Sequence, residues 1–102
     1  VDQIDEPQAV QRDDGSWLVD GMLPVEEFFE LFEIEELPRE QRGNYHTMGG
    51  FVVTQLGRIP IATDHFEWRG MRFEVMDMDG NRVDKVLVVP LPNKRHKPVN
   101  EN

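Results

Sequence analysis

Apolar residues recur with two different periods along the chain, and each period predicts a different kind of element. Four apolar residues after Pro24 lie at positions i, i+3, i+4 and i+7, which is one face of a helix: Val25, Phe28, Phe29 and Phe32. Pro24 suits the first turn of such a helix, because a proline there loses no needed N–H group. The opposite side is acidic, with Glu26, Glu27, Glu30 and Glu33. We therefore predict an amphipathic, acidic helix that starts at Pro24.

A second helix is predicted between Thr47 and Gly57. Thr47 can cap its first turn, apolar residues follow as far as Leu56, and Gly57 is placed to end it. Gly49 and Gly50 are unusual there, because each glycine costs about 1 kcal/mol relative to alanine inside a helix. Close approach of another backbone is one explanation. The alternative is that residues 47–50 present their amide groups to an anion, as a cofactor phosphate site would.

Alternating patterns on either side of the helices predict antiparallel strands. Residues 9–20 predict a hairpin with its turn at residues 14–15. After the second helix the period becomes two, and turns at residues 69–70 and 79–80 separate three further strands. The last strand, residues 83–89, ends in four consecutive apolar residues, which predicts burial on both of its faces. The pattern leaves open whether this strand is central or at an edge of the sheet.

This order of elements predicts an α+β fold, in which an antiparallel sheet of four to five strands carries both helices on one face. We predict one domain over residues 9–91, preceded by a linker or frayed terminus at residues 1–8 and followed by a flexible basic tail at residues 92–102. Residues 34–44 are expected to connect the two helices, with up to one turn of helix. A chain of 102 residues has room for one modest core.

Composition narrows the class of protein. Apolar residues make up 38% and charged residues 30% of the chain, which is typical of a soluble globular domain. The absence of cysteine excludes a disulfide framework, a thiolate metal site and a thiol nucleophile. The longest apolar run, residues 86–89, is too short to insert into a membrane, and no signal peptide is recognisable. Because the chain begins with Val1, we expect it to be a fragment of a longer polypeptide.

The charge is unevenly distributed. The net charge is −9, and residues 1–40 hold 13 of the 20 acidic residues but only two of the 11 basic ones. Nucleic acid and anionic membranes are therefore unsuitable partners, because phosphate contacts need clustered Lys and Arg. The acidic half could attract cations or a basic partner. It could equally serve only to keep a small domain in solution.

No set of catalytic side chains is recognisable, so we expect neither catalytic residues nor an enzyme. Ser16 is the only serine and lies in a turn, and the three histidines are isolated from one another. Asp77 and Asp79 begin a sequence similar to a calcium loop, but Arg82 stands where the glycine is required and Val88 where the glutamate is required. An acidic hairpin turn explains this segment, with an adventitious metal site at the two aspartates as the alternative.

Residues 45–60, YHTMGGFVVTQLGRIP, resemble the T-hydrophobic-G-G … L-G-R-I-P signature of the CorC/HlyC transporter-associated domain. The turn at residues 14–17, the acidic helix and the hairpin of aromatic and apolar residues before Val86 also resemble this family, so the likeness covers about residues 9–90. The chain departs from the family at residues 62–64, which commonly include a glycine, and at Leu23, where a polar residue is frequent.

The resemblance implies a fold related to the second subdomain of PCMH-type FAD-binding proteins. It also implies a parent of the hemolysin-like, magnesium and cobalt efflux type, at the cytoplasmic side of a bacterial inner membrane. The leading expectation is a non-enzymatic regulatory or interaction domain of such an ion transport protein. Its expected partners are the CBS domains and the membrane domain of the same parent chain, or a second copy in a homodimer.

Two other functions remain open under this resemblance. One is a module that binds FAD or an adenine nucleotide, with Thr47, Gly49 and Gly50 as the candidate residues. The other is a domain whose acidic half senses divalent cations. The family supplies no catalytic residues to assign, and the glycines of its signature, together with Ile59 and Pro60, are expected to determine the fold.

Overall fold

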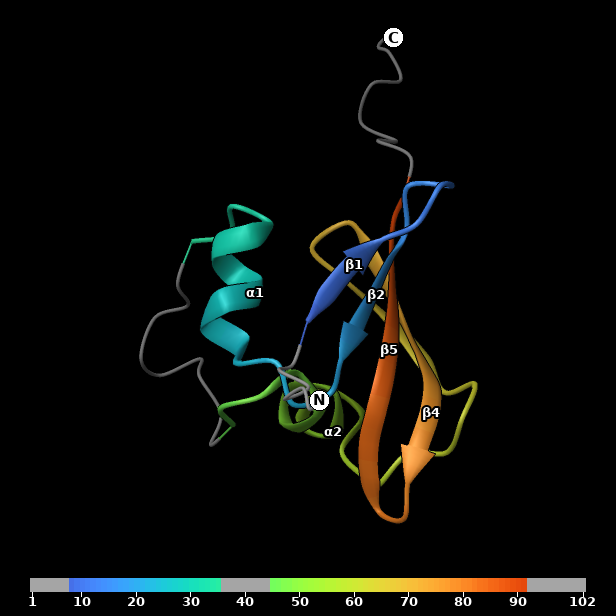
Figure 1. The fold of residues 1–102 in the computed structure, drawn as a ribbon. Helices are drawn as coiled ribbons and strands as arrows, with labels where there is room; N and C mark the ends of the chain where they lie inside the picture. Colours follow the sequence, from blue (N-terminus) through green and yellow to red (C-terminus); the bar gives the residue numbers. More distant parts are fainter. Residues whose placement is uncertain (1–7, 36–44, 92–102) are drawn as a thin grey trace, which may run out of the picture.

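The computed structural model describes residues 8–35 and 45–91, and within them the chain forms one sheet and two helices (Figure 1). The predicted α+β class is confirmed. The predicted tail, residues 1–7 of the predicted linker and residues 36–44 of the predicted connection lie outside the described residues. The elements in chain order are β1 (Ala9–Gln11), β2 (Trp17–Asp20), α1 (Val25–Leu31), α2 (Met48–Leu56), β3 (His65–Trp68), β4 (Met71–Asp79) and β5 (Arg82–Pro90).

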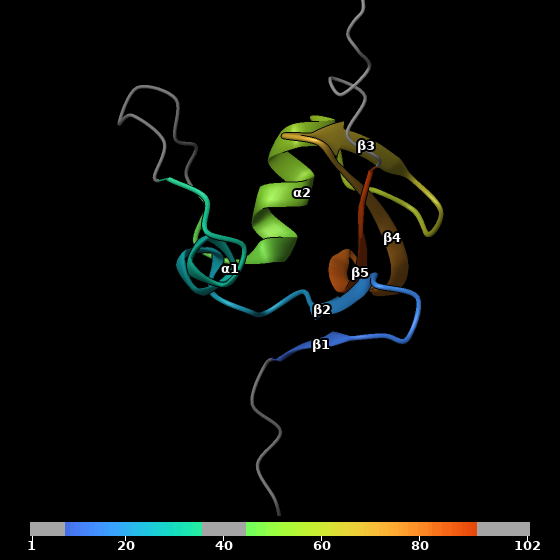
Figure 2. The same ribbon diagram turned by 90° about the horizontal axis from the view of Figure 1, so that it is seen from above.

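The five strands form a single antiparallel sheet in the order β1-β2-β5-β4-β3. The last strand in the sequence is therefore the central one, which answers the question that its apolar pattern left open. Val86 in β5 lies between Val19 of β2 and Val75 of β4. Figure 2 shows the sheet curving around α2, with α1 at the open side of the curve.

Aromatic rings fill the space between the helices and the concave face of the sheet. Phe28 from α1, Phe51 from α2 and Phe73 from β4 are fully buried. The Phe73 ring lies with its centroid 5.8 Å from that of Phe28 and 5.7 Å from that of Phe51. Burying a side chain of this size stabilises the fold by roughly 1.5–3 kcal/mol relative to leaving it exposed. These three rings therefore connect both helices to the sheet.

The expectation that the end of β5 is buried on both faces was wrong for one face. Val86 and Val88 are fully buried against the helices, whereas Leu87 and Val89 are only half-buried on the opposite face. The reason is that both described helices lie on the same side of the sheet (Figure 2). Leu87 is instead shielded in part by its neighbour on the sheet, Leu18 of β2, which lies directly opposite it.

Candidate functional site

The doubled glycine lies at the start of α2, where the helix comes closest to the sheet. Gly49 is buried, and a Cβ atom there would lie 3.1 Å from the Gly21 carbonyl oxygen and 3.3 Å from Val83 Cβ. Gly21, directly after β2, has even less room, because a Cβ atom there would overlap the Val83 carbonyl group. Gly50 differs from both, since the atoms nearest to a Cβ there would be Tyr45 Cβ at 3.0 Å and the Thr47 hydroxyl oxygen at 3.5 Å, and not a backbone carbonyl group.

The amide groups of the first turn of α2 all donate to acceptors within the chain. The Met48 N–H bonds the Leu23 carbonyl at 2.9 Å, and the Gly49 N–H bonds the Gly21 carbonyl at 2.8 Å. The Gly50 N–H bonds the Thr47 hydroxyl oxygen at 3.1 Å, which is the predicted cap. An anion at this helix start would have to displace these bonds. The geometry therefore favours close packing as the explanation of the glycines.

The two candidate metal-binding aspartates lie at the hairpin between β4 and β5. Asp79 accepts a hydrogen bond from the Arg82 guanidinium at 2.7 Å, across a two-residue turn in which Gly80 has a φ of 63°. Asp77 stands opposite Lys85, beside an irregularity in the β4–β5 pairing. Within residues 8–35 and 45–91, no three His, Asp or Glu side chains come together in a group that could hold a metal ion.

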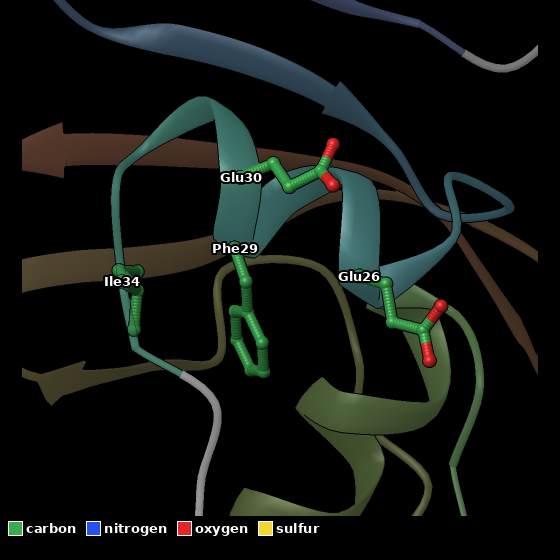
Figure 3. Close-up of a pocket in the computed structure, with 4 residues that line it drawn as sticks. All are labelled: Glu26, Phe29, Glu30 and Ile34. Carbon is green, nitrogen blue, oxygen red and sulfur yellow. The ribbon is translucent and has the colours of Figure 1, made fainter.

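The acidic side of α1 borders a shallow hollow. Glu26, Phe29, Glu30 and Ile34 line a space of about 270 Å³ (Figure 3). Phe29 and Ile34 extend to the same side, while the two carboxylates extend away from the Phe29 ring. The hollow thus offers an apolar surface beside two carboxylates, which is chemistry suited to a basic, partly apolar partner.

Ser16 is bound into the turn between β1 and β2. Its side chain is buried, and its hydroxyl donates to an Asp14 carboxylate oxygen at 2.6 Å, while its N–H donates to the same oxygen at 2.9 Å. The side-chain hydrogen bond from Ser16, followed by the backbone one, lowers the pKa of Asp14 below its ordinary value. The only serine of the chain is therefore a structural part of a hairpin turn.

A loop that sequence reasoning treated only as a fold determinant turns out to expose apolar side chains. Pro60 is buried, whereas Ile59 is 54% exposed and Ile61 is 68% exposed. These residues connect α2 to β3. Of the two residues expected to determine the fold, only the proline is buried, so the Ile59 side chain is not part of the core.

Asp64 holds this loop in place. Its carboxylate accepts a hydrogen bond from the Ile61 N–H at 2.9 Å and lies 2.7 Å from the Arg58 guanidinium. The hydrogen bond from Ile61, helped by Arg58, lowers the pKa of Asp64 although partial burial opposes it. Thr63 adopts a φ of 83°, and its N–H donates to the Val75 carbonyl of β4 at 2.8 Å. The loop is thus fixed to the sheet at a strained residue.

The described residues form a small α+β module. The family model described as the transporter associated domain matches residues 10–92. The chain therefore belongs to the CorC_HlyC transporter-associated domain family, as the motif at residues 45–60 predicted. This is a family of transporter-associated domains and not of enzymes.

Relatives of known name are much longer than this chain. It is 57% identical over 91 residues to the UPF0053 protein sll0260 of Synechocystis, covering 89% of this chain and 20% of that protein. It is 45% identical over 93 residues to the polyamine export protein of Salmonella typhimurium, covering 91% of this chain and again 20% of the relative. The chain thus spans about a fifth of the length of these relatives.

Solved structures of the same domain have the same fold. A transporter-associated domain from a Xylella fastidiosa hemolysin, in complex with Mg²⁺ and Mn²⁺, has a TM-score of 0.72 and is 43% identical, covering 82% of this chain and 98% of that one. The domain from Nitrosomonas europaea has a TM-score of 0.73 at 30% identity, covering 84% and 99%. The five-stranded sheet with two helices is therefore the architecture of this family.

The relatives and solved structures support some of the predicted functions more than others. They give no support to flavin binding, and the relation to PCMH-type proteins stays a prediction. They support a transport context, but not specifically magnesium or cobalt efflux. Neither α1 nor α2, the two helices of the described residues, is long and apolar enough to cross a membrane.

Proposed function

We propose that this chain is a non-enzymatic regulatory domain of a bacterial cation export protein. The observation that carries the proposal is the family match over residues 10–92, combined with relatives five times longer of which several are named for polyamine export. The Ser16 hydroxyl and the first-turn amides of α2 are engaged in the domain's own structure, so they support packing and not chemistry. A small domain of a transporter can act by favouring one conformational state of the rest of the chain.

The proposed cargo is a cation, and its class is open to a direct test. The sequence resemblance pointed to Mg²⁺ and Co²⁺, whereas several relatives are named polyamine export protein. Both are positively charged, so an acidic domain beside the transport path is compatible with either. Its partners in this proposal are the CBS and membrane domains of the parent chain, at the cytoplasmic side of the inner membrane.

Deletion of residues 9–91 from the parent protein tests the regulatory role. Export of labelled spermidine and of Co²⁺ is measured in cells that produce the intact or the shortened parent, after the amounts in the membrane fraction have been matched. We expect export of one cargo to change at least several-fold, in rate or in its dependence on cargo concentration. Unchanged export of both cargoes, together with unchanged abundance, would contradict a regulatory role.

A second candidate function, the sensing of divalent cations, is favoured by the complex of the Xylella domain with Mg²⁺ and Mn²⁺. Here Asp77 and Asp79 are the candidate ligands, although Asp79 is already paired with Arg82. A metal that binds the folded domain raises its melting temperature by mass action. We would compare MgCl₂ and MnCl₂ with NaCl at equal ionic strength, in the native chain and in the Asp77→Asn variant. An equal change in melting temperature with all three salts would contradict cation sensing.

A further inference from the structure

The loop from Arg58 to Asp64 exposes the two most solvent-accessible large apolar side chains of the described residues. Ile61 is 68% exposed and Ile59 is 54% exposed, and neither belongs to the buried core or packs against it. Single exposed apolar residues are ordinary on protein surfaces. Two isoleucines on either side of a buried proline are different, because the burial of Pro60 and its restricted φ hold the residue that lies between them.

The loop is also held by hydrogen bonds and an ion pair of its own. The Asp64 carboxylate accepts the Ile61 N–H at 2.9 Å and pairs with Arg58 at 2.7 Å, while the Asp64 N–H donates back to the Ile61 carbonyl at 3.1 Å. The Val75 N–H of β4 donates to the Asp64 carbonyl at 2.8 Å. A surface held in one conformation loses little entropy on binding, which favours association for a given contact area.

The position and charge of the loop indicate what kind of partner it fits. In Figures 1 and 2 it projects beyond β4, on the side of the molecule away from the acidic α1. Its guanidinium and carboxylate neutralise each other, so the projecting surface is apolar and carries little net charge. A partner would therefore present an apolar recess and not a charged patch.

The small size of this surface argues against a second copy of the chain as the partner. A stable interface between separate proteins buries roughly 1,200–2,000 Å², and two isoleucines cannot supply that. A covalently attached partner needs much less, because tethering by a short linker gives an effective concentration on the order of millimolar. The relatives contain four fifths of their length outside this domain.

We propose that Ile59 and Ile61 form a docking knob that inserts into an apolar recess elsewhere in the same parent chain. This assignment rests on the proposed function, since it names the surface through which a regulatory domain would contact the transporter. Asp64 is a positioning residue in this contact: it holds the loop and does not touch the partner.

Cysteine labelling tests the docking knob directly, because the chain has no cysteine of its own. The Ile61→Cys variant is made in this 102-residue chain and in the parent protein, and its reaction rate with a maleimide is followed by mass spectrometry of the labelled peptide. The family's solved structures are chains of about this size, which supports using the short chain alone. We expect labelling to be at least ten-fold slower in the parent than in the short chain.

Met22 provides the matched control, because it is 46% exposed in the turn between β2 and α1. The Met22→Cys variant should label at the same rate in both proteins. Equal rates for Ile61→Cys in both proteins would overturn the proposal, and so would equal slowing of both variants, which indicates general occlusion of the domain. Slowing that appears in the short chain as its concentration rises would assign the knob to self-association and also overturn it.

The Asp64→Asn substitution adds a second readout. Combined with Ile61→Cys in the parent, it should restore faster labelling by loosening the loop, while the melting temperature of the short chain confirms that the domain still folds. These results are independent of transport. If deletion of the domain leaves export unchanged but Ile61→Cys is protected, docking stands and regulation fails; if export changes and Ile61→Cys is unprotected, regulation stands and this contact surface is wrong.

Discussion

The two helices lie on the same face of the sheet but are held there by different means. Helix α2 has a threonine cap at its start and a glycine with a φ of 76° at its end, whose N–H donates to the Val53 carbonyl. Helix α1 has seven residues and no side-chain cap. Backbone hydrogen bonds from Met48 and Gly49 connect α2 to the segment after β2.

Helix α1 is attached mainly through its aromatic rings. Phe28 contacts Phe73, and Phe32 lies with its ring centroid 5.4 Å from that of Trp17. Packed rings can shift slightly to accommodate a change in side-chain volume. Main-chain atoms in direct contact cannot do so without moving the backbone. In α2, close backbone contact is added to the packing of Phe51, whereas in α1 ring packing supplies the contact with the sheet. Changes in volume should therefore be felt most strongly near α2.

The largest effect is expected from Gly21→Ala. The added methyl group would overlap the Val83 carbonyl, and the main chain on one side has to move. We expect a loss of about 3 kcal/mol in the free energy of unfolding, at the upper end of typical overpacking costs. Urea unfolding measures it, with Gly50→Ala as the control, since that position meets mainly the Tyr45 and Thr47 side chains. Equal effects at the two glycines would refute the backbone-contact explanation of α2.

A smaller effect is expected from Thr47→Ala. This change removes the hydroxyl that accepts the Gly50 N–H, and loss of such a cap typically costs about 1 kcal/mol. The same substitution at Thr54, which is exposed in the last turn of α2, removes no N-terminal cap and is the control. If Thr54→Ala destabilises the protein as much as Thr47→Ala, capping is not what anchors this helix start.

The Asp64→Asn substitution should have a smaller effect still, and it should alter how the melting temperature depends on pH only in acid. The pKa of Asp64 is lowered in the folded protein, so its stabilising contribution is present above the pKa of the unfolded chain, near 3.8, and is lost as the pH falls through the lower folded value. The melting temperature of the native chain should therefore fall more steeply below pH 4 than that of Asp64→Asn. Asp14→Asn is a comparison at another group with a lowered pKa. Parallel curves for the native chain and Asp64→Asn would mean that Asp64 does not hold the loop.

The smallest effect is expected on the acidic side of α1. Glu30 is exposed at the border of the hollow, and exposed substitutions usually change stability by less than about 0.5 kcal/mol. Glu30→Gln should therefore leave the urea midpoint almost unchanged at low and at high salt. A loss comparable to that of Thr47→Ala would show that α1 depends on its charges and not on its rings.

The sequence allowed the elements to be predicted because their signals are local. The spacing of Phe28 and Phe29, the cap at Thr47 and the alternation in β4 each depend on near neighbours only. Gly49 could also be interpreted, because a glycine inside a helix has to be explained by something outside it. Gly21 could not, since a glycine after a strand is ordinary in any turn.

What stayed hidden depends on residues far apart in the sequence. The pairing of Val19 with Val86 joins the first hairpin to the last strand, and no local pattern specifies such a partner. The half-burial of Leu87 has the same origin, because the apolar run in β5 does not say which face the helices will cover. Exposure of Ile59 likewise became visible only once the position of the loop on β4 was known.

The central position of β5 has a consequence for synthesis of the protein. The first hairpin leaves the ribosome about 60 residues before the strand that it must pair with. Until residues 85–88 have emerged, β2 has an unpaired edge, and the buried side chains of both helices lack the central strand of the sheet. Such exposed intermediates are prone to aggregation and are substrates of chaperones. Premature termination anywhere in the last strand should therefore yield a chain that is degraded, rather than a smaller working domain.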